Sequence, residues 1–414
     1  VLSGAISEDV IDESVRLILR KKFEMGLFDD PFRFCNENRE KQQWDNRAHR
    51  DIARNMARKS IVLLKNDKEL LPLKENVKTI AMIGPLVKAV GENNGFWSYS
   101  WPDDSVRIVT QWQGILNRAG NQANLLYAKG CGITEPDSSG FKEAVEIAMK
   151  ADVVIMSVGE SANMSGEAKS RSNIQLPGVQ EELIKAVYAT GKPLVIIINA
   201  GRPLVFNWTA DHAHAILYTW WLGTEAGNAI ADVVFGDYNP SGKLPMSFPR
   251  SEGQIPVYYS YFNTGRPPKD ENDLNYVSAY IDMPNSPRFP FGYGLSYTSF
   301  SISEPVLNTT TITAGEELII KVTVSNTGNA DGTETIQLYF RDKVGSLVRP
   351  VKQLAGFQQV FLRKGESRTL TFTLTEKDLR FYNENLEFVS EPGEFEVFIG
   401  NSADNLKGKG FVLE

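Results

Sequence analysis

The feature that most constrains the fold is an alternation of short apolar runs with amphipathic segments between residues 79 and 235. The apolar runs lie at 79–84, 124–128, 151–158, 193–199 and 215–220. The amphipathic segments, which we expect to be helices, lie at 108–119, 140–150, 177–189 and 225–235. Strands that alternate with helices form a mostly parallel sheet with helices on both of its faces. We therefore expect an αβα sandwich.

A long polar loop at residues 159–177 follows the most apolar of these strands. Its flanking strand, 151–158, is rich in β-branched residues, which is typical of a strand buried on both faces. Ligands of open α/β sheets bind at the carboxyl ends of the strands. The loop carries Glu160, Glu167 and Arg171, and Pro177 suits the first turn of the next helix. This loop is therefore the first candidate for a functional site.

Several function classes are disfavoured by the sequence. The turn at residues 84–88 does not match GxGxxG, and no GxxxxGK[ST] motif occurs, which argues against nucleotide binding. The net charge of −7 argues against nucleic acid and anionic membrane as partners. The sequence contains no run of 18 apolar residues, so we expect no transmembrane helix. The two cysteines and three histidines match no CxxC or HExxH pattern, so we expect neither a metal nor an organic cofactor.

The ends of the chain follow other patterns. At 414 residues, two or three domains are expected. An amphipathic helix begins after Ser7 and ends near Gly26, residues 32–47 are interpreted as a linker, and a second helix covers about 47–60. Because the chain opens in mid-pattern, we expect the first residues to be the tail of a larger structure. After residue 300, alternating strands predict a β-sandwich of immunoglobulin or fibronectin type III kind.

Six stretches, taken in order, resemble glycoside hydrolase family 3, the group of β-glucosidases and β-xylosidases. They are residues 21–28, 60–66, 70–73, 199–203, 236–245 and 291–297. The most specific is GDYNPSGKLP at 236–245. The resemblance implies four parts: the end of a (β/α)8 barrel with a linker (1–47), an α/β sandwich (48–262), an interdomain strap (263–300) and a fibronectin type III-like domain (301–414).

The resemblance also implies a retaining mechanism with two carboxylates. The family nucleophile is an aspartate in a Ser-Asp-Trp-type motif on the barrel, and no such motif occurs here. A barrel takes about 250 residues, and only its final helix is expected in this chain. The implied partners are the N-terminal barrel of the same protein and a β-glucoside or oligosaccharide substrate. A homodimer and a periplasmic or secreted location are further expectations.

The general acid/base is then expected in the loop at 159–177. Glu167 follows Ser165 and Gly166 at mid-loop, where glycine allows close approach of a substrate, and a Ser-Gly-Glu pattern resembles the family's acid/base position. We predict Glu167 as the acid/base. Glu160 adjoins the strand end and is expected to orient or cap its surroundings. Arg171 is expected to pair with either glutamate or to bind a substrate hydroxyl.

Two further substrate contacts, Trp97 and Ser98, are predicted in the loop after the first strand, since the similar family segment contains Trp-Ser. Packing is the alternative interpretation of Trp97. The sequence favours core or interdomain packing for Trp208, Trp220 and Trp221.

The resemblance thus implies hydrolysis of terminal non-reducing β-D-glucosyl residues from β-glucosides and cello-oligosaccharides by double displacement. β-Xylosidase activity is the next candidate. A non-catalytic sugar-binding or structural module is the alternative if the chain acts alone.

Overall fold

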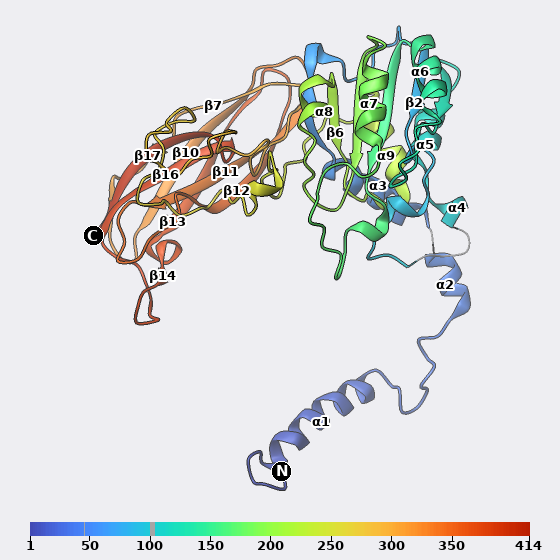
Figure 1. Cartoon of the computed structure of the whole chain (residues 1–414). Coiled ribbons are helices and arrows are strands. Elements are labelled where there is room, and N and C mark those ends of the chain that lie inside the picture. The colour runs from blue at the N-terminus through green and yellow to red at the C-terminus, as the bar shows by residue number, and fades with distance from the viewer. Residues whose placement is uncertain (45, 100–103) are drawn as a thin grey trace. The chain divides into compact units, whose positions relative to one another are not determined.

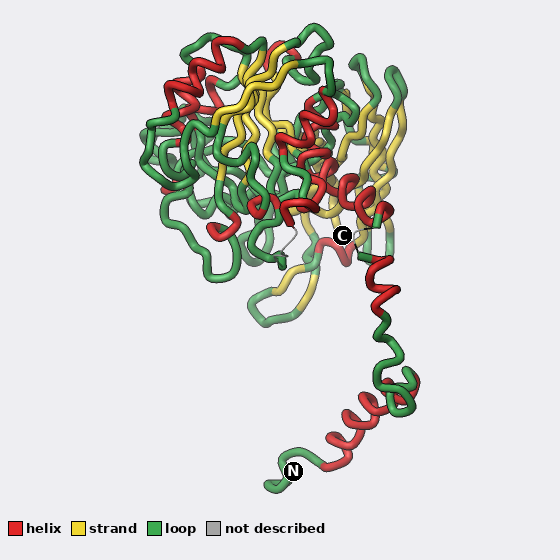
Figure 2. The backbone as a smooth tube through the Cα atoms, turned by 90° about the vertical axis from the view of Figure 1, so that its right-hand side faces the viewer, coloured by secondary structure: helices red, strands yellow, loops and turns green. Residues whose placement is uncertain are grey.

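The computed structural model describes residues 1–44, 46–99 and 104–414, which form two units, Val1–Asp51 and Ile52–Glu414. Figure 1 labels the elements along the chain, and Figure 2 distinguishes helices from strands. The first unit contains α1 (Glu8–Glu24) and α2 (Glu37–Gln43). Gly26, with φ of 65°, follows the end of α1 as expected. Interpreting residues 32–47 as a linker missed α2, whose Asn36 side chain caps the helix by accepting a hydrogen bond from the Arg39 N–H.

The second unit begins with a six-stranded sheet in the order β1-β6-β5-β4-β2-β3. The strands are β1 (Val62–Asn66), β2 (Thr79–Ile83), β3 (Asn124–Ala128), β4 (Val153–Gly159), β5 (Leu194–Asn199) and β6 (Ala215–Tyr218). Strand β1 pairs antiparallel with β6, and the other neighbours pair in parallel. The expected mostly parallel sheet is therefore confirmed.

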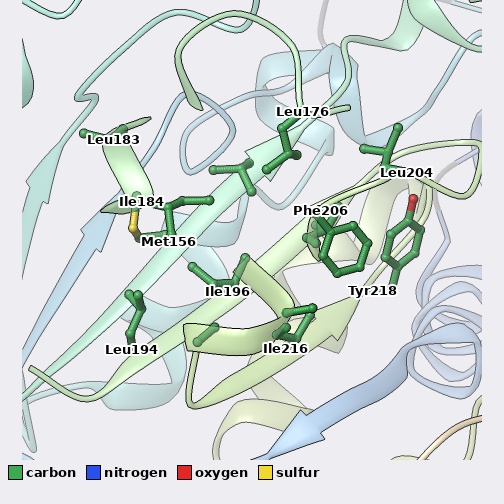
Figure 3. Packing of buried hydrophobic residues seen from close by; sticks show 14 of the residues in the cluster. Met156, Leu176, Leu183, Ile184, Leu194, Ile196, Leu204, Phe206, Ile216 and Tyr218 are labelled. Atoms are coloured by element: carbon green, nitrogen blue, oxygen red, sulfur yellow. The ribbon is translucent and has the colours of Figure 1, made fainter. Parts of the chain in front are cut away.

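Helices pack on both faces of this sheet. They are α3 (Arg47–Ser60), α5 (Gln111–Ala119), α6 (Phe141–Lys150), α7 (Gln180–Tyr188), α8 (Asn207–His212) and α9 (Ala226–Val234). A short helix, α4 (Asp104–Arg107), precedes α5. Every residue of β4 is buried, and its side chains alternate between two cores. Met156 packs with residues of α6, α7 and α8, whereas Ile155 packs with residues of α5 and α9. Figure 3 shows Met156 beside Ile184 of α7 in the first of these cores.

The start of α7 differs from the sequence prediction. The helix begins at Gln180, and Pro177 lies ahead of it rather than in its first turn. Gly178 has φ of 63°, in the left-handed region, so the backbone cannot be helical there. A Cβ at this position would also lie 2.9 Å from the carbonyl oxygen of Ile133. The glycine therefore sets the length of the loop that precedes α7.

The C-terminal part is a β-sandwich, as the alternation predicted. One sheet contains β13 (Ser367–Thr375), β10 (Glu317–Asn326), β7 (Phe300–Ile302) and β8 (Val306–Leu307). The other has the order β12 (Gln353–Leu362), β11 (Gly332–Asp342), β16 (Gly393–Ser402), β17 (Asn405–Leu413) and β9 (Thr311–Ile312). A hairpin of β14 (Phe381–Tyr382) and β15 (Phe388–Val389) adjoins them. Within the described residues, no helix has the length and apolarity needed to cross a bilayer.

Candidate functional site

The carboxyl edge of the α/β sheet brings together the loops that follow β2, β4, β5 and β6. The loop after β4 departs at Gly159, where φ is 138°. A Cβ at Gly159 would lie 1.9 Å from the carbonyl oxygen of Asn199 at the end of β5, so only glycine fits. The next amide, of Glu160, donates to this same carbonyl over 2.8 Å. The start of the loop is therefore held against β5.

A buried glutamine side chain holds the same point from the other side. Gln180, the first residue of α7, accepts from the Gly159 N–H over 2.8 Å and donates to the Gly159 carbonyl over 2.8 Å. Its amide nitrogen also donates to the Ile133 carbonyl over 2.9 Å. Buried N–H and C=O groups need hydrogen-bond partners. The Gln180 side chain provides a partner for both such groups of Gly159.

Glu160 is fully buried and forms two ion pairs. Arg171 Nη1 lies 2.5 Å from Glu160 Oε1, and Arg202 Nε lies 3.1 Å from the same oxygen. Arg171 therefore pairs with one of the two glutamates that the sequence left open as its partners. Its Nη2 donates to the Gln175 carbonyl over 3.3 Å. Burying a carboxylate costs free energy unless it is paired, and here two guanidinium groups provide the pairing.

Arg202 ties the loop to the end of β5, and the sequence analysis assigned it no role. Its Nη2 donates to the carbonyls of Met164 and Lys169, the latter over 2.7 Å, so it bridges the two sides of the turn that contains Glu167. Its own carbonyl accepts from the Tyr218 hydroxyl. Burial and the Glu160 charge hold the pKa of this phenol well above its usual value, so it remains a donor. The sequence signal that could have identified Arg202 was its position within the stretch 199–203, which resembles the family.

Glu167 lies at the exposed corner of a turn. The Lys169 N–H donates to the Gly166 carbonyl over 3.2 Å, and Ala168 has φ of 57°, as the third residue of a type II turn requires. Within the described part of the chain, the Glu167 carboxylate makes no hydrogen bond or ion pair. The backbone at Glu167 is thus fixed while its carboxylate is free for another molecule.

The loop after β2 contacts this turn. A Cβ at Gly166 would lie 2.3 Å from the ring of Phe96, so the glycine allows that ring to pack against the turn. Trp97 makes an edge-to-face contact with Phe96 at 5.2 Å and remains 74% exposed, which excludes the interpretation of Trp97 as a core residue. The Ser98 hydroxyl donates to the Gly95 carbonyl over 2.9 Å. The structure therefore brings the segment with Trp97 and Ser98 next to the turn with Glu167.

Three other tryptophans, Trp208, Trp220 and Trp221, have packing roles. Trp208 and Trp220 pack against the core, as the sequence favoured, and Trp208 stacks on His212 at 4.1 Å. Trp221 lies beneath two loops: a Cβ at Gly95 would lie 2.8 Å from its ring, and one at Gly201 would lie 2.6 Å from its Nε1. Its ring is therefore a common support for the loops after β2 and β5.

Comparison with known proteins gives two family matches. Residues 61–297 match the family described as glycosyl hydrolase family 3 C-terminal domain, and residues 334–403 match the fibronectin type III-like domain. A periplasmic beta-glucosidase from Salmonella typhimurium is 44% identical over 100% of this chain and 57% of its own length. A beta-xylosidase from Formosa agariphila is 38% identical over 96% of this chain and 54% of its own length.

Solved structures agree with these matches. A beta-glucosidase from Listeria innocua, in complex with isofagomine, superimposes with a TM-score of 0.91 and 38% identity. The alignment covers 100% of this chain and 57% of that protein. The chain therefore spans little more than half the length of each of these three relatives.

Proposed function

Because the chain belongs to glycosyl hydrolase family 3, we propose that it is the acid/base-bearing part of a retaining exo-β-glycosidase. The substrate would be a β-glucoside or cello-oligosaccharide, cleaved at its terminal non-reducing β-D-glucosyl residue. The observation that carries this proposal is the free, exposed carboxylate of Glu167 on a turn whose backbone is held from both sides. The four-part division at residues 47, 262 and 300 is proposed along with it.

In this mechanism Glu167 acts twice. It first protonates the glycosidic oxygen as the bond to the leaving group breaks, and it then removes a proton from the attacking water. The nucleophile would be an aspartate on the barrel, with the two carboxyl groups about 5–5.5 Å apart. The N-terminal barrel of the same protein is therefore the proposed partner of this chain.

The neighbours of Glu167 have separate roles. We assign substrate contact to Trp97 and Ser98, because an exposed aromatic ring offers an apolar face to a sugar ring. Substrate binding by Arg171 stays a prediction from the sequence. The contacts of Arg171 with Glu160 and Gln175 favour a positioning role, since they already use both ends of its guanidinium group.

A β-xylosidase is the second candidate, supported by the similarity to the Formosa agariphila protein of that name. The two sugars differ by one hydroxymethyl group. The periplasm is the proposed location, supported by the name of the Salmonella typhimurium relative.

The test is Glu167→Gln in the complete protein, assayed on aryl β-glucosides with a series of leaving groups. Poor leaving groups need protonation, so their kcat/KM should fall by about 10²–10⁴-fold, whereas very good leaving groups should lose much less. Azide needs no general base and should restore turnover. Glu160→Gln should show neither the leaving-group dependence nor the rescue. The opposite pattern in these two variants would reverse the assignment.

A further inference from the structure

We propose that the fibronectin type III-like sandwich binds a neutral oligosaccharide in a hollow on the outer face of its five-stranded sheet. The hollow has a volume of about 530 Å³ and lies between this sheet and the strap, and a pocket of this size accommodates a small ligand. Its lining comprises Tyr261, Asn263, Arg341, Val351, Lys352, Glu396, Phe398, Ala403, Asp404, Leu406 and Gly408. None of them comes from the loops around Glu167, so the proposal does not rest on the function proposed above.

A glycine in β17 shapes the floor of the hollow. Along β16 the side chains alternate, with Phe395 and Val397 buried in the sandwich core and Phe398 on the outer face. On β17, Gly408 is the direct partner of Phe398. A Cβ at Gly408 would lie 2.6 Å from Glu396 Oε1 and 3.1 Å from the Phe398 ring. The glycine therefore lets the Phe398 ring and the Glu396 carboxylate lie across the surface of β17, where they form part of the wall of the hollow.

Hydrogen bonds fix the walls of the hollow. The Val351 N–H donates to the Tyr261 carbonyl over 2.9 Å, which joins the residues just ahead of the strap to the segment before β12. Lys352 Nζ donates to the Ala403 carbonyl over 2.5 Å, which joins that segment to the turn between β16 and β17. The site is thus formed before any ligand arrives, which reduces the entropic cost of binding.

Three of the four charged side chains in the hollow make no hydrogen bond or ion pair with the described part of the chain. Arg341 and Glu396 are direct cross-strand partners on β11 and β16, where oppositely charged side chains commonly pair. Yet among the described residues neither they nor Asp404 make a side-chain hydrogen bond or ion pair. Arg341 and Lys352 balance the two carboxylates, so the site has no net formal charge and suits a neutral ligand.

The chemistry of these groups fits a saccharide. Arginine offers several fixed N–H donors, while the carboxylates of Glu396 and Asp404 offer acceptors. A sugar hydroxyl both donates and accepts, so neighbouring hydroxyls can bind both kinds of group at once. Phe398 and Tyr261 supply apolar surface for the C–H groups of the ring.

A second hollow, of about 780 Å³, indicates a ligand longer than a disaccharide. It is lined mainly by residues 254–287 of the connecting segment. The two hollows share Tyr261, Asn263, Lys352 and Asp404 in their linings, so they adjoin. We therefore expect a tetrasaccharide to bind more tightly than the corresponding disaccharide.

The test uses the 414-residue chain with cellotetraose and laminaritetraose as probes. Isothermal titration calorimetry should detect binding of at least one probe. Arg341→Ala and Phe398→Ala should each weaken it by about tenfold, since each removes a charged hydrogen bond or a ring contact. Arg363→Ala and Phe357→Ala are matched controls, because they change the same residue types at exposed positions of the sandwich outside the lining. These controls should retain the affinity of the unchanged chain.

A second measurement needs no variant. In methyl NMR spectra, the probe should shift the signals of Val351 and Leu406, which line the hollow, and leave Leu338 in the sandwich core unchanged. If neither probe binds at a concentration of about 10 mM, the proposal is overturned, because even a site with a millimolar Kd would be occupied at that concentration. Binding that shifts methyl groups elsewhere, or that the control variants weaken equally, would overturn it as well.

Discussion

Replacing Glu160 by glutamine tests whether the buried carboxylate holds the loop in place. The change preserves the shape of the side chain and removes its charge. Glu160 is fully buried, while the side chains of Arg171 and Arg202 are 18% and 17% exposed. Two guanidinium groups would thereby lose the anion that compensates their charges. Glu167→Gln is the matched control, because it makes the same chemical change seven positions later at an exposed site.

The expected size follows from these contacts. Breaking a buried ion pair costs about 3–5 kcal/mol when it leaves an uncompensated charge. The low end applies here, because both arginines are partly exposed and still donate to backbone carbonyls. We therefore expect Glu160→Gln to lower the free energy of unfolding by about 3 kcal/mol. At about 2–4 °C per kcal/mol for a domain of this size, Tm should fall by about 6–12 °C.

Differential scanning calorimetry of the 414-residue chain measures this change. The transition of the α/β part should move in Glu160→Gln, while the transition of the sandwich should stay in place. Glu167→Gln should change the free energy of unfolding by less than about 0.5 kcal/mol, as is usual for an exposed residue without partners. Equal shifts in Glu160→Gln and Glu167→Gln, or a loss below about 1 kcal/mol in the former, would refute the anchoring role of the buried pair.

Two other predictions concern buried groups. Gln180→Leu should lower the free energy of unfolding by about 2–4 kcal/mol, because it leaves both backbone groups of Gly159 without partners. Urea denaturation measures this loss. The control Gln113→Leu changes the same residue type at an exposed position and should show no such loss. Burial raises the pKa of the Cys131 thiol to about 11, so at pH 8 it stays protonated and unreactive. Mass spectrometry after iodoacetamide treatment should find one adduct, on the exposed Cys35, and two adducts in urea; a second adduct in the folded chain would contradict the burial.

The arrangement of the sheet was predictable because the sequence patterns of its strands and helices are local. A strand such as β4, buried on both faces, needs a continuous apolar run, and the helices between strands need an apolar stripe, so both are visible in short windows. The antiparallel pairing of β1 with β6 was not visible, since Leu63 pairs with Leu217 more than 150 positions later. The start of α7 was missed because Gly178 adopts a left-handed conformation, which a pattern of apolar residues does not report.

The proximity of the loops that carry the predicted site residues was predictable in a similar way. Glu167, Trp97 and Ser98 lie in loops that follow neighbouring parallel strands, and parallel strands bring such loops to the same edge. What the sequence did not assign is the support behind them. Arg202 reaches Glu160 across 42 positions, and Gln180 reaches Gly159 across 21, so both contacts depend on the completed fold.

The contacts of the loop fit the different roles that we propose for its two glutamates. A general acid/base exchanges protons with the leaving group and then with water in every turnover, so it needs open space and access to water. Reaction geometry, however, tolerates little movement of the same group. Glu167 lies in open space, and its backbone is restrained by Arg202 at Met164 and Lys169. Glu160 completes the restraint by binding Arg202 below the turn, at a place closed to solvent. In the proposed mechanism, Glu167 would therefore provide the accessible carboxylate, while Glu160 would help to hold its backbone in place.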